Sequence, residues 1–354
     1  MSTIRANTIQ DASGGSNAQL FGVASPPNSM GFRNRIINGA MVIDQRNAGA
    51  SVTPAGGVYT LDRWEAVLTQ ASKFSVQQNA GSVARPAGFT NYLGTTSTSA
   101  YSVLAGDFFA IRQKIEGFNV ADLGWGAAGA QTVTLSFWVR SSLTGTFGGS
   151  LYNADGSRSY PFSYTISAAN TWELETVTIT GDTTGTWGTG NGAGIQVGFS
   201  LGAGSTFSGT AGSWSGSFFI SATGATSVVG TNGATFYITG VQLEAGTVAS
   251  PFERRDYGTE LVRCQRYYEV LVVSGSNILL FPGSIDFARN SYPFKITKRA
   301  TPTVAGGSGS AEGGGSWTPN YQVSGVETWS ISAFYGSSLI RPVLNGPVTA
   351  SIEL

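Results

Sequence analysis

Short runs in which hydrophobic and polar residues alternate dominate this chain, and long helical periodicity is rare. The clearest run is 132–141, in which every second residue from Val133 to Val139 is apolar. Successive side chains of a strand point to opposite faces, so this pattern predicts a strand with one buried face. Turns rich in Gly, Ser, Thr and Asn separate the runs, which favours an all-β fold.

The runs between residues 33 and 255 are numerous enough for a jelly-roll β-sandwich. The predicted strands are 34–37, 41–45, 64–68, 73–77, 91–95, 108–115, 132–141, 149–153, 160–166, 173–179, 194–201, 216–222 and 234–243. We therefore predict a first domain that covers residues 33–255.

Residues 236–269 change pattern three times and predict a joint between two domains. A strand is expected over 236–244, with a bulge at Gly240. Pro251 has no N–H to donate to a ladder, so the chain should leave the sheet there. From Thr259 to Tyr268 the apolar residues follow helical spacing. The sequence thus predicts a short helical joint over 256–269, in which Cys264 is a buried thiol.

Residues 270–354 predict a second, smaller β-sandwich. Its expected strands are 267–273, 277–282, 284–287, 291–296, 301–304, 322–326, 329–333 and 348–354. The glycine-rich segment 306–315 predicts a flexible loop between strands. Residues 1–32 have too few apolar side chains for a core and contain the extended Pro26-Pro27 pair, so they predict a terminal segment that does not fold alone.

Three segments resemble a family of phage tail fibre and related prophage virion proteins. They are RNRIINGAMVIDQR at 33–46 with YTLDRW at 59–64, NTWELETVTITGDTTGTW at 170–187, and QLEAGTVASPFERRDYGTELVRCQRYYE at 242–269. The resemblance covers roughly residues 30–300. It implies a jelly roll like that of a carbohydrate-binding module and attachment to the tail or baseplate through residues 1–32. It brings no catalytic motif.

Charge is scarce in this chain. Charged residues are 11% of the sequence and the net charge is zero, so no overall field favours nucleic acid or an anionic membrane. No charged residue occurs from Thr183 to Leu243. Two interpretations stay open for that stretch: a surface solvated by hydroxyls and amides, or a face buried against copies of the chain. Three-fold symmetry is usual in the family it resembles, so we expect a homotrimer.

Several kinds of chemistry are excluded by residue type. The chain has no histidine and one cysteine, which removes the usual nucleophilic triads and thiolate or histidine metal sites. No phosphate-binding or dinucleotide fingerprint is present. No apolar run is long enough to span a membrane, and no signal-peptide pattern opens the chain. We therefore expect no cofactor, no metal and no membrane insertion.

A carboxylate pair for glycan cleavage is the remaining enzymatic possibility. Glu173 and Glu175 lie two apart on one predicted strand, opposite Leu174 and Thr176. Parallel side chains do not flank a bond, so the simpler interpretation is that they keep a sheet face soluble. The other candidate carboxylates are Asp155, Asp182 and Asp286. Asp155-Gly156 and Gly181-Asp182 also resemble parts of calcium loops, although a β-turn explains the first pair.

Sugar binding needs aromatic rings with a polar rim. Trp64, Trp138 and Trp172 lie in strand patterns and predict core positions, whereas Trp125, Trp187, Trp214 and Trp317 lie in glycine-rich surroundings and are surface candidates. Two groups combine rings with amides. The preferred receptor-binding group is Trp317, Asn320 and Tyr321, and the rival group is Trp187 with Asn191.

Together these patterns predict a non-enzymatic structural tail fibre or tail-tip protein of the virion, synthesised in the host cytoplasm. Its C-terminal β-domain would be distal and would contact a host surface polysaccharide. Two alternatives remain: a fibre with polysaccharide depolymerase activity, and a virion component with a structural role only.

Overall fold

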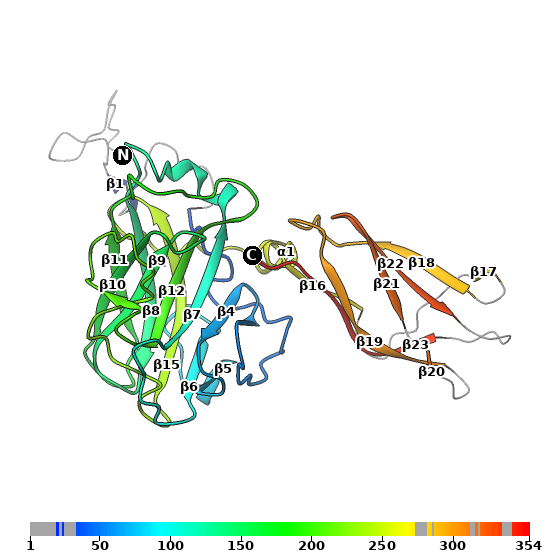
Figure 1. Cartoon of the computed structure of the whole chain (residues 1–354), viewed down its shortest axis with the longest axis horizontal. Helices are drawn as coiled ribbons and strands as arrows, with labels where there is room; N and C mark the ends of the chain where they lie inside the picture. The colour runs from blue at the N-terminus through cyan, green and yellow to red at the C-terminus, as the bar shows by residue number, and fades with distance from the viewer. Residues whose placement is uncertain are drawn as a thin grey trace, which may run out of the picture.

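The computed structural model describes residues 19–20, 23–24, 33–272, 282–284, 287–311, 316–317, 319–334 and 342–354. Strands β1 (Gln19–Leu20) and β2 (Val23–Ala24) pair with each other; the rest of the predicted terminal segment 1–32 lies outside the described residues. The described chain forms two β-sandwiches with one α-helix between them (Figure 1). Within these ranges, no helix is long and apolar enough to cross a membrane.

Two antiparallel sheets face each other in the first domain. The six-stranded sheet has the order β10 (Ser159–Ile166), β9 (Gly145–Tyr152), β12 (Ala193–Ala203), β7 (Phe108–Glu116), β4 (Trp64–Leu68) and β3 (Val58–Leu61). The five-stranded sheet has the order β11 (Glu173–Ile179), β8 (Val133–Ser141), β15 (Thr235–Ala245), β6 (Leu93–Ser97) and β5 (Phe74–Gln78). The strands adjacent in space are often far apart in sequence, as in a jelly roll. The predicted all-β class is confirmed.

Short elements connect these strands. They are the 3-10 helices η1 (Ala80–Ser82), η2 (Gly117–Asn119) and η3 (Ala121–Leu123), and the parallel pair β13 (Ser208–Gly209) and β14 (Ser221–Ala222). The strand predicted over 216–222 is therefore reduced to the two residues of β14.

One hydrophobic core fills the space between the sheets. Every second residue of β8 from Val133 to Val139 is fully buried, as the alternation predicts. Trp64 is also fully buried in this core. Trp138 lies on the opposite face of β8 and is half-buried. The core position predicted for Trp138 is therefore wrong, whereas Trp172 packs against a smaller core formed by Ala80, Tyr92 and Tyr237.

The strands predicted over 34–37 and 41–45 are absent. Asn38 and Met41 have left-handed backbones with φ of 57° and 58°, which breaks an extended strand. The Asn38 side chain replaces the missing ladder: its amide donates to the carbonyls of Ile43 and Asp62, and its oxygen accepts from the Ile43 N–H. Buried main-chain groups need such partners away from a sheet.

The bulge predicted at Gly240 is confirmed. The register of β15 against β8 shifts between Thr239 and Gln242. Gly240 has φ of +61°, a left-handed conformation that favours glycine. A Cβ at this position would also lie 2.6 Å from the Phe89 ring, so a larger residue would clash. Asn34 bonds the bulged segment: its Nδ2 donates to the Val241 carbonyl at 3.0 Å, and its Oδ1 accepts from Leu243 N–H at 3.1 Å.

The predicted helix of the joint is α1 (Tyr257–Gln265). Asp256 caps it, because its carboxylate accepts from Thr259 N–H at 2.9 Å. Cys264 is fully buried with Ile37, Ile43 and Tyr267. Burial raises the pKa of the Cys264 thiol well above its usual value. The helix thus packs against the first domain through a small hydrophobic core made of these residues.

The second sandwich consists of two four-stranded sheets. One has the order β16 (Tyr268–Val272), β23 (Pro342–Ser351), β19 (Thr303–Ala311) and β20 (Ser316–Trp317). The other has the order β17 (Pro282–Ser284), β18 (Phe287–Pro293), β22 (Thr328–Phe334) and β21 (Asn320–Ser324). Trp329, Ile331, Leu344 and Val348 belong to its core.

The flexible loop predicted over 306–315 is wrong for residues 306–311, which belong to β19 (Thr303–Ala311). β19 continues through Ala311 and pairs with β23, with a register shift between Gly306 and Ser308. Residues 312–315 lie outside the described residues. Glycine weakens a strand but does not prevent one when a neighbouring strand supplies the ladder.

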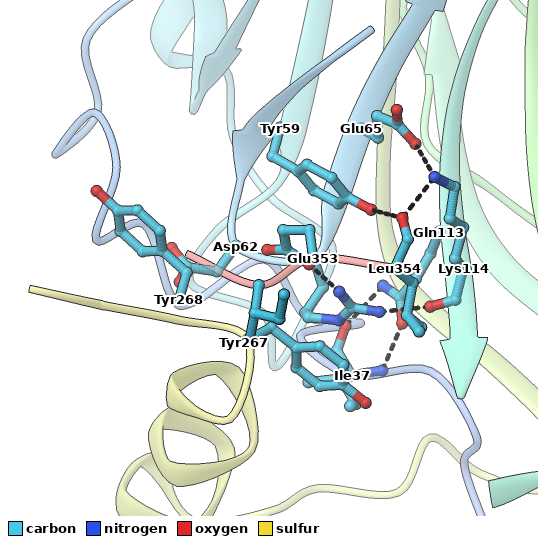
Figure 2. A network of polar contacts seen from close by, with 12 residues as sticks. Ile37, Tyr59, Asp62, Glu65, Gln113, Lys114, Tyr267, Tyr268, Glu353 and Leu354 are labelled. Atoms are coloured by element: carbon cyan, nitrogen blue, oxygen red, sulfur yellow. Dashed lines mark hydrogen bonds and ion pairs between the residues drawn. The ribbon is translucent and has the colours of Figure 1, made fainter. Parts of the chain in front are cut away.

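The final residues of the described chain return to the first domain, and the C-terminus lies beside α1 (Figure 1). The Glu353 carboxylate accepts from Arg46 and from Arg63. The guanidinium of Arg63 lies 3.6 Å from the Tyr267 ring centroid, and Arg63 is 1% exposed. Figure 2 shows this network at the meeting point of β3, β7 and the end of the chain.

Further bonds extend the same contact (Figure 2). The Leu354 main-chain oxygen accepts from Lys114 Nζ at 2.6 Å and from the Tyr59 hydroxyl at 3.2 Å. Burial lowers the pKa of Lys114 and raises that of Tyr59. These groups are held out of water between two domains, which links the domains firmly.

Candidate functional site

Three tryptophans meet at one end of the jelly roll, and they are the strongest candidate for a ligand platform. Trp125 and Trp187 have ring centroids 4.7 Å apart, and each lies 5.4 Å from Trp214. All three pairs are edge-to-face, with interplanar angles of 79–84°. Edge-to-face contact is the favoured geometry for such rings. We call these three residues the tryptophan cluster.

Loops far apart in sequence build the tryptophan cluster. Trp125 follows η3, Trp187 follows β11, and Trp214 lies between β13 and β14. Each indole N–H donates to a main-chain carbonyl, those of Gln131, Thr184 and Thr180 in that order, at 2.7–3.1 Å. The cluster is half-buried and packs against the main core. With the donors already bonded, a ligand meets ring surface there.

A partly buried ion pair supports one side of the tryptophan cluster. Arg158 donates from Nε and Nη2 to the Asp182 carboxylate at 2.6 and 2.9 Å, and its guanidinium lies 5.9 Å from the Trp214 ring. Burial alone would raise the pKa of Asp182, but bonds from Arg158 and Thr184 outweigh it and lower the pKa. Asp182 stays ionised, and Arg158, with five N–H donors, keeps a polar edge beside the rings.

The predicted partner of Trp187 has a different position. Asn191 lies in the contact between the domains, where its Nδ2 donates to the Arg299 carbonyl at 3.1 Å and its own carbonyl accepts from Arg299 Nη1 at 2.7 Å. The structure therefore groups Trp187 with Trp125 and Trp214, and it uses the amide of Asn191 to join two domains.

The preferred receptor-binding group, Trp317, Asn320 and Tyr321, is distributed over both sheets of the second sandwich. Trp317 belongs to β20, and Asn320 and Tyr321 open β21. Consecutive strand residues point to opposite faces. Asn320 is exposed, whereas Tyr321 packs toward the core and donates its hydroxyl to the Gly306 carbonyl at 2.7 Å. The predicted strands 301–304 and 322–326 leave all three residues outside a strand, whereas the structure places them in β20 and β21. Their receptor contact stays a prediction.

The candidate carboxylates mostly have structural partners. Glu173 accepts from the Ala168 and Ser167 amides at 2.8 and 3.0 Å, which lowers its pKa. Burial, then the Glu173 charge, raises the pKa of Glu175. Both are half-buried, whereas Leu174 between them is 57% exposed. The interpretation of a carboxylate-solvated face is wrong, because the two carboxylates share the half-buried side of β11 with Val177 and the buried Ile179, and Leu174 points outward. Asp286 lies outside the described residues.

The carboxylates of the two possible calcium segments already accept hydrogen bonds from protein groups. Asp155 accepts from the N–H and hydroxyl of Ser157, and Gly156 has φ of +73°, so a turn accounts for this pair. Asp182 is bonded to Arg158 and Thr184. Among the residues described here, no group of three or more Cys, Asp or Glu gathers in a way that could hold a metal.

No family model matches this chain, and no curated protein matches it. Among solved structures, the enzymatically active domain of tailspike protein 4 from bacteriophage CBA120 is similar, with a TM-score of 0.31 and 12% identity, over 52% of this chain and 20% of that one. A family 61 carbohydrate-binding module in complex with β-1,4-galactotriose is similar with a TM-score of 0.31 and 10% identity, over 61% of this chain and 100% of the module.

A family 11 carbohydrate-binding module from Clostridium thermocellum, in complex with a β-1,3-1,4-mixed-linked tetrasaccharide, is also similar. Its TM-score is 0.29 and its identity 10%, over 56% of this chain and 98% of the module. The chain spans about a fifth of the tailspike domain and nearly all of these modules. At identities and TM-scores of this size, the matches leave the ligand of this chain open.

Sequence reasoning selected Trp125, Trp187 and Trp214 singly and missed that they form one cluster. It also missed Phe118, which is 65% exposed on η2. The glycine-rich surroundings signalled surface rings, but no local pattern shows which loops meet. Only the sheet order brings the ends of β8, β11 and β12 together.

Proposed function

We propose that this protein is a phage tail fibre or tail-tip protein whose jelly roll recognises a host surface glycan through the tryptophan cluster. The observation that carries the proposal is the mutual edge-to-face contact of three half-buried tryptophans, Trp125, Trp187 and Trp214, at the end of the jelly roll. Sugar rings stack their apolar faces on aromatic rings, and hydroxyls bond at a polar rim such as Arg158.

Replacing Trp187 with alanine tests this proposal. We expect binding to a panel of immobilised bacterial surface polysaccharides to fall by at least about tenfold, because a central aromatic contact often contributes about 2 kcal/mol or more. Binding can be measured by biolayer interferometry on the intact chain. Thermal unfolding of the same samples shows whether the loss comes from binding or from the fold.

Trp172→Ala is the matched control. Trp172 is also half-buried, and its indole N–H also donates to a carbonyl, that of Ala84 at 2.7 Å. It packs on Tyr92, outside the tryptophan cluster. Equal losses of binding in both variants, or intact binding in Trp187→Ala, would overturn the proposed platform and return attention to Trp317, Asn320 and Tyr321.

Attachment and assembly complete the proposal. Residues 1–32 would attach to the tail or baseplate, as the sequence resemblance implies, and deleting them should abolish incorporation into particles. The chain would form a homotrimer, which the charge-free stretch 183–243 favours because such a surface is easily buried against copies. Sedimentation of the intact chain should give a trimer at micromolar concentration; a stable monomer contradicts this.

A polysaccharide depolymerase is the alternative function. It needs two carboxylates on either side of a glycosidic bond. Glu173 and Glu175 follow one another on one side of β11, and Glu173 is bonded to main-chain amides. The contacts therefore favour recognition without cleavage. Shortened polysaccharide chains after incubation with the purified protein would decide for the enzyme.

A further inference from the structure

A second aromatic surface lies on the outer face of the five-stranded sheet, away from the core. Trp138 of β8 is at its centre, and its register partner on β11 is Leu174, which is 57% exposed. The rings of Phe89 and Trp138 lie 2.6 and 3.1 Å from the point where a Cβ on Gly240 would stand, so the two rings adjoin. The ring centroids of Phe252 and Phe89 are 5.2 Å apart. We call Phe89, Trp138, Leu174 and Phe252 the outer patch.

Trp138 has an indole N–H that is still free to donate. Each of the other tryptophans of the jelly roll donates its indole N–H to a main-chain carbonyl; they are Trp64, Trp125, Trp172, Trp187 and Trp214. Within the described part of the chain, no group accepts from the Trp138 N–H, and its nitrogen stays accessible to solvent. A half-buried ring with a free donor at its edge suits a sugar, which offers an apolar ring face and hydroxyls.

Two arginines flank the outer patch, and neither is paired with a carboxylate among the residues that the structure describes. Arg140 lies two residues after Trp138 on the same face of β8. Its Nε donates to the Asn170 carbonyl at 2.9 Å, which leaves both terminal nitrogens for a ligand. Arg254 is exposed, lies over the two phenylalanine rings of the patch at 4.8 and 5.9 Å, and donates from Nη1 to the Gly88 carbonyl.

The carboxylates on the neighbouring elements already have partners. Glu253 accepts from two main-chain N–H groups and pairs with Arg255 at 3.2 Å. Asp256 caps α1, and the buried Glu244 accepts from the N–H and the hydroxyl of Ser250. The two carboxylates of β11 lie on the opposite side of that strand from the patch. The two flanking guanidiniums are thus left without a carboxylate, and an anionic ligand can supply one.

We infer that the outer patch binds a segment of an acidic polysaccharide, with sugar rings against Trp138 and sugar carboxylates toward Arg140 and Arg254. Guanidinium and carboxylate form short, charge-assisted bonds, and the aromatic rings hold the sugar rings beside them. The patch lies on an open sheet face, so it accommodates several linked units. This site is separate from the tryptophan cluster at the end of the jelly roll, and it does not depend on the function proposed for that cluster.

Isothermal titration of the intact chain with tetragalacturonate tests the inference. Its methyl ester has the same rings and linkages without the charge, and tetraglutamate has the charge without the rings. We expect saturable binding of tetragalacturonate with a Kd below about 1 mM, and at least about tenfold weaker binding of the other two probes. Equal binding of the ester would overturn the role of the arginines, and equal binding of tetraglutamate would overturn that of the rings. No saturable binding up to about 5 mM tetragalacturonate would overturn the site.

Two variants locate the site. Trp138→Ala and Arg254→Gln should each weaken tetragalacturonate binding by about tenfold or more. Because Arg254 is exposed, its variant should keep the melting temperature and remains informative if Trp138→Ala unfolds.

Two further variants are controls and should bind tetragalacturonate normally. Lys295→Gln removes one cation whose side chain is 58% exposed in the second sandwich, and Trp187→Ala alters the tryptophan cluster. Equal loss in Lys295→Gln and Arg254→Gln would overturn the inference, because it would show an effect of net charge alone. Loss in Trp187→Ala with normal binding in both site variants would also overturn it, and it would leave the proposed function of the tryptophan cluster standing.

Discussion

At two positions of this protein, one asparagine side chain makes the hydrogen bonds that a neighbouring strand would otherwise supply. Asn34 lies in one predicted strand and Asn38 lies between two, and both use their amides as substitutes for a neighbouring strand. Asn34 is 2% exposed, and its two bonds reach the segment of β15 where the ladder is interrupted. An asparagine suits this role because its amide donates and accepts at once.

Replacing Asn34 with alanine should destabilise the first domain by at least about 2 kcal/mol. The change leaves the Val241 carbonyl and the Leu243 N–H buried without that partner. Urea unfolding measures the effect. Asn232→Ala, in an exposed turn, is the control and should change stability by less than about 0.5 kcal/mol. Equal stability of the two variants would show that water replaces the Asn34 amide.

At the scale of elements, the edge strand β11 shows that alternation alone does not reveal which face of a strand is buried. The alternation of β11 is correct, but Leu174 faces water, and the two carboxylates are half-buried on the side where Val177 and Ile179 pack against the core. β11 ends the five-stranded sheet, so one of its edges has no neighbour within that sheet. Charged side chains near an edge discourage pairing with another chain. The element's place in the sheet, more than its own pattern, decides which face is buried.

At the scale of the whole molecule, a charged cluster fastens the second sandwich to the first. Glu353 pairs with two arginines of the jelly roll, and Arg299 of the second domain bonds to Asn191 and to the Ile352 and Glu353 carbonyls. Lys298 and Glu269 form a further buried ion pair within the second domain, and the Lys298 ammonium also donates to the Gln265 carbonyl at the end of α1. These bonds, largely removed from water, hold the two domains together.

Glu353→Gln should destabilise the protein by about 3–5 kcal/mol, because it leaves the buried charge of Arg63 without its carboxylate. Hydrogen exchange should also show faster opening of the final strand β23. Asp122→Asn is the control: Asp122 pairs with Arg35 at 2.6 Å but is 54% exposed, so its loss should cost about 1 kcal/mol or less. Similar effects in both variants would show that the contact between the domains contributes little.

The sequence by itself determined the features that depend on neighbouring residues. Alternation located most strands of both sandwiches, helical spacing located α1, and Gly240 marked the bulge. Its lack of histidine narrowed the possible chemistry. These signals are local because side-chain direction in a strand or helix repeats over two to four residues.

Only the tertiary structure decided which residues far apart in the sequence come into contact. Trp125, Trp187 and Trp214 are separated by long stretches of chain and become one cluster because β8, β11 and β12 have ends at one side of the sandwich. Arg266 and Tyr267 bond to Glu116 of β7 because the joint packs against the end of that strand. Sheet order and domain contact arise from burial summed over the whole chain, which no local pattern records.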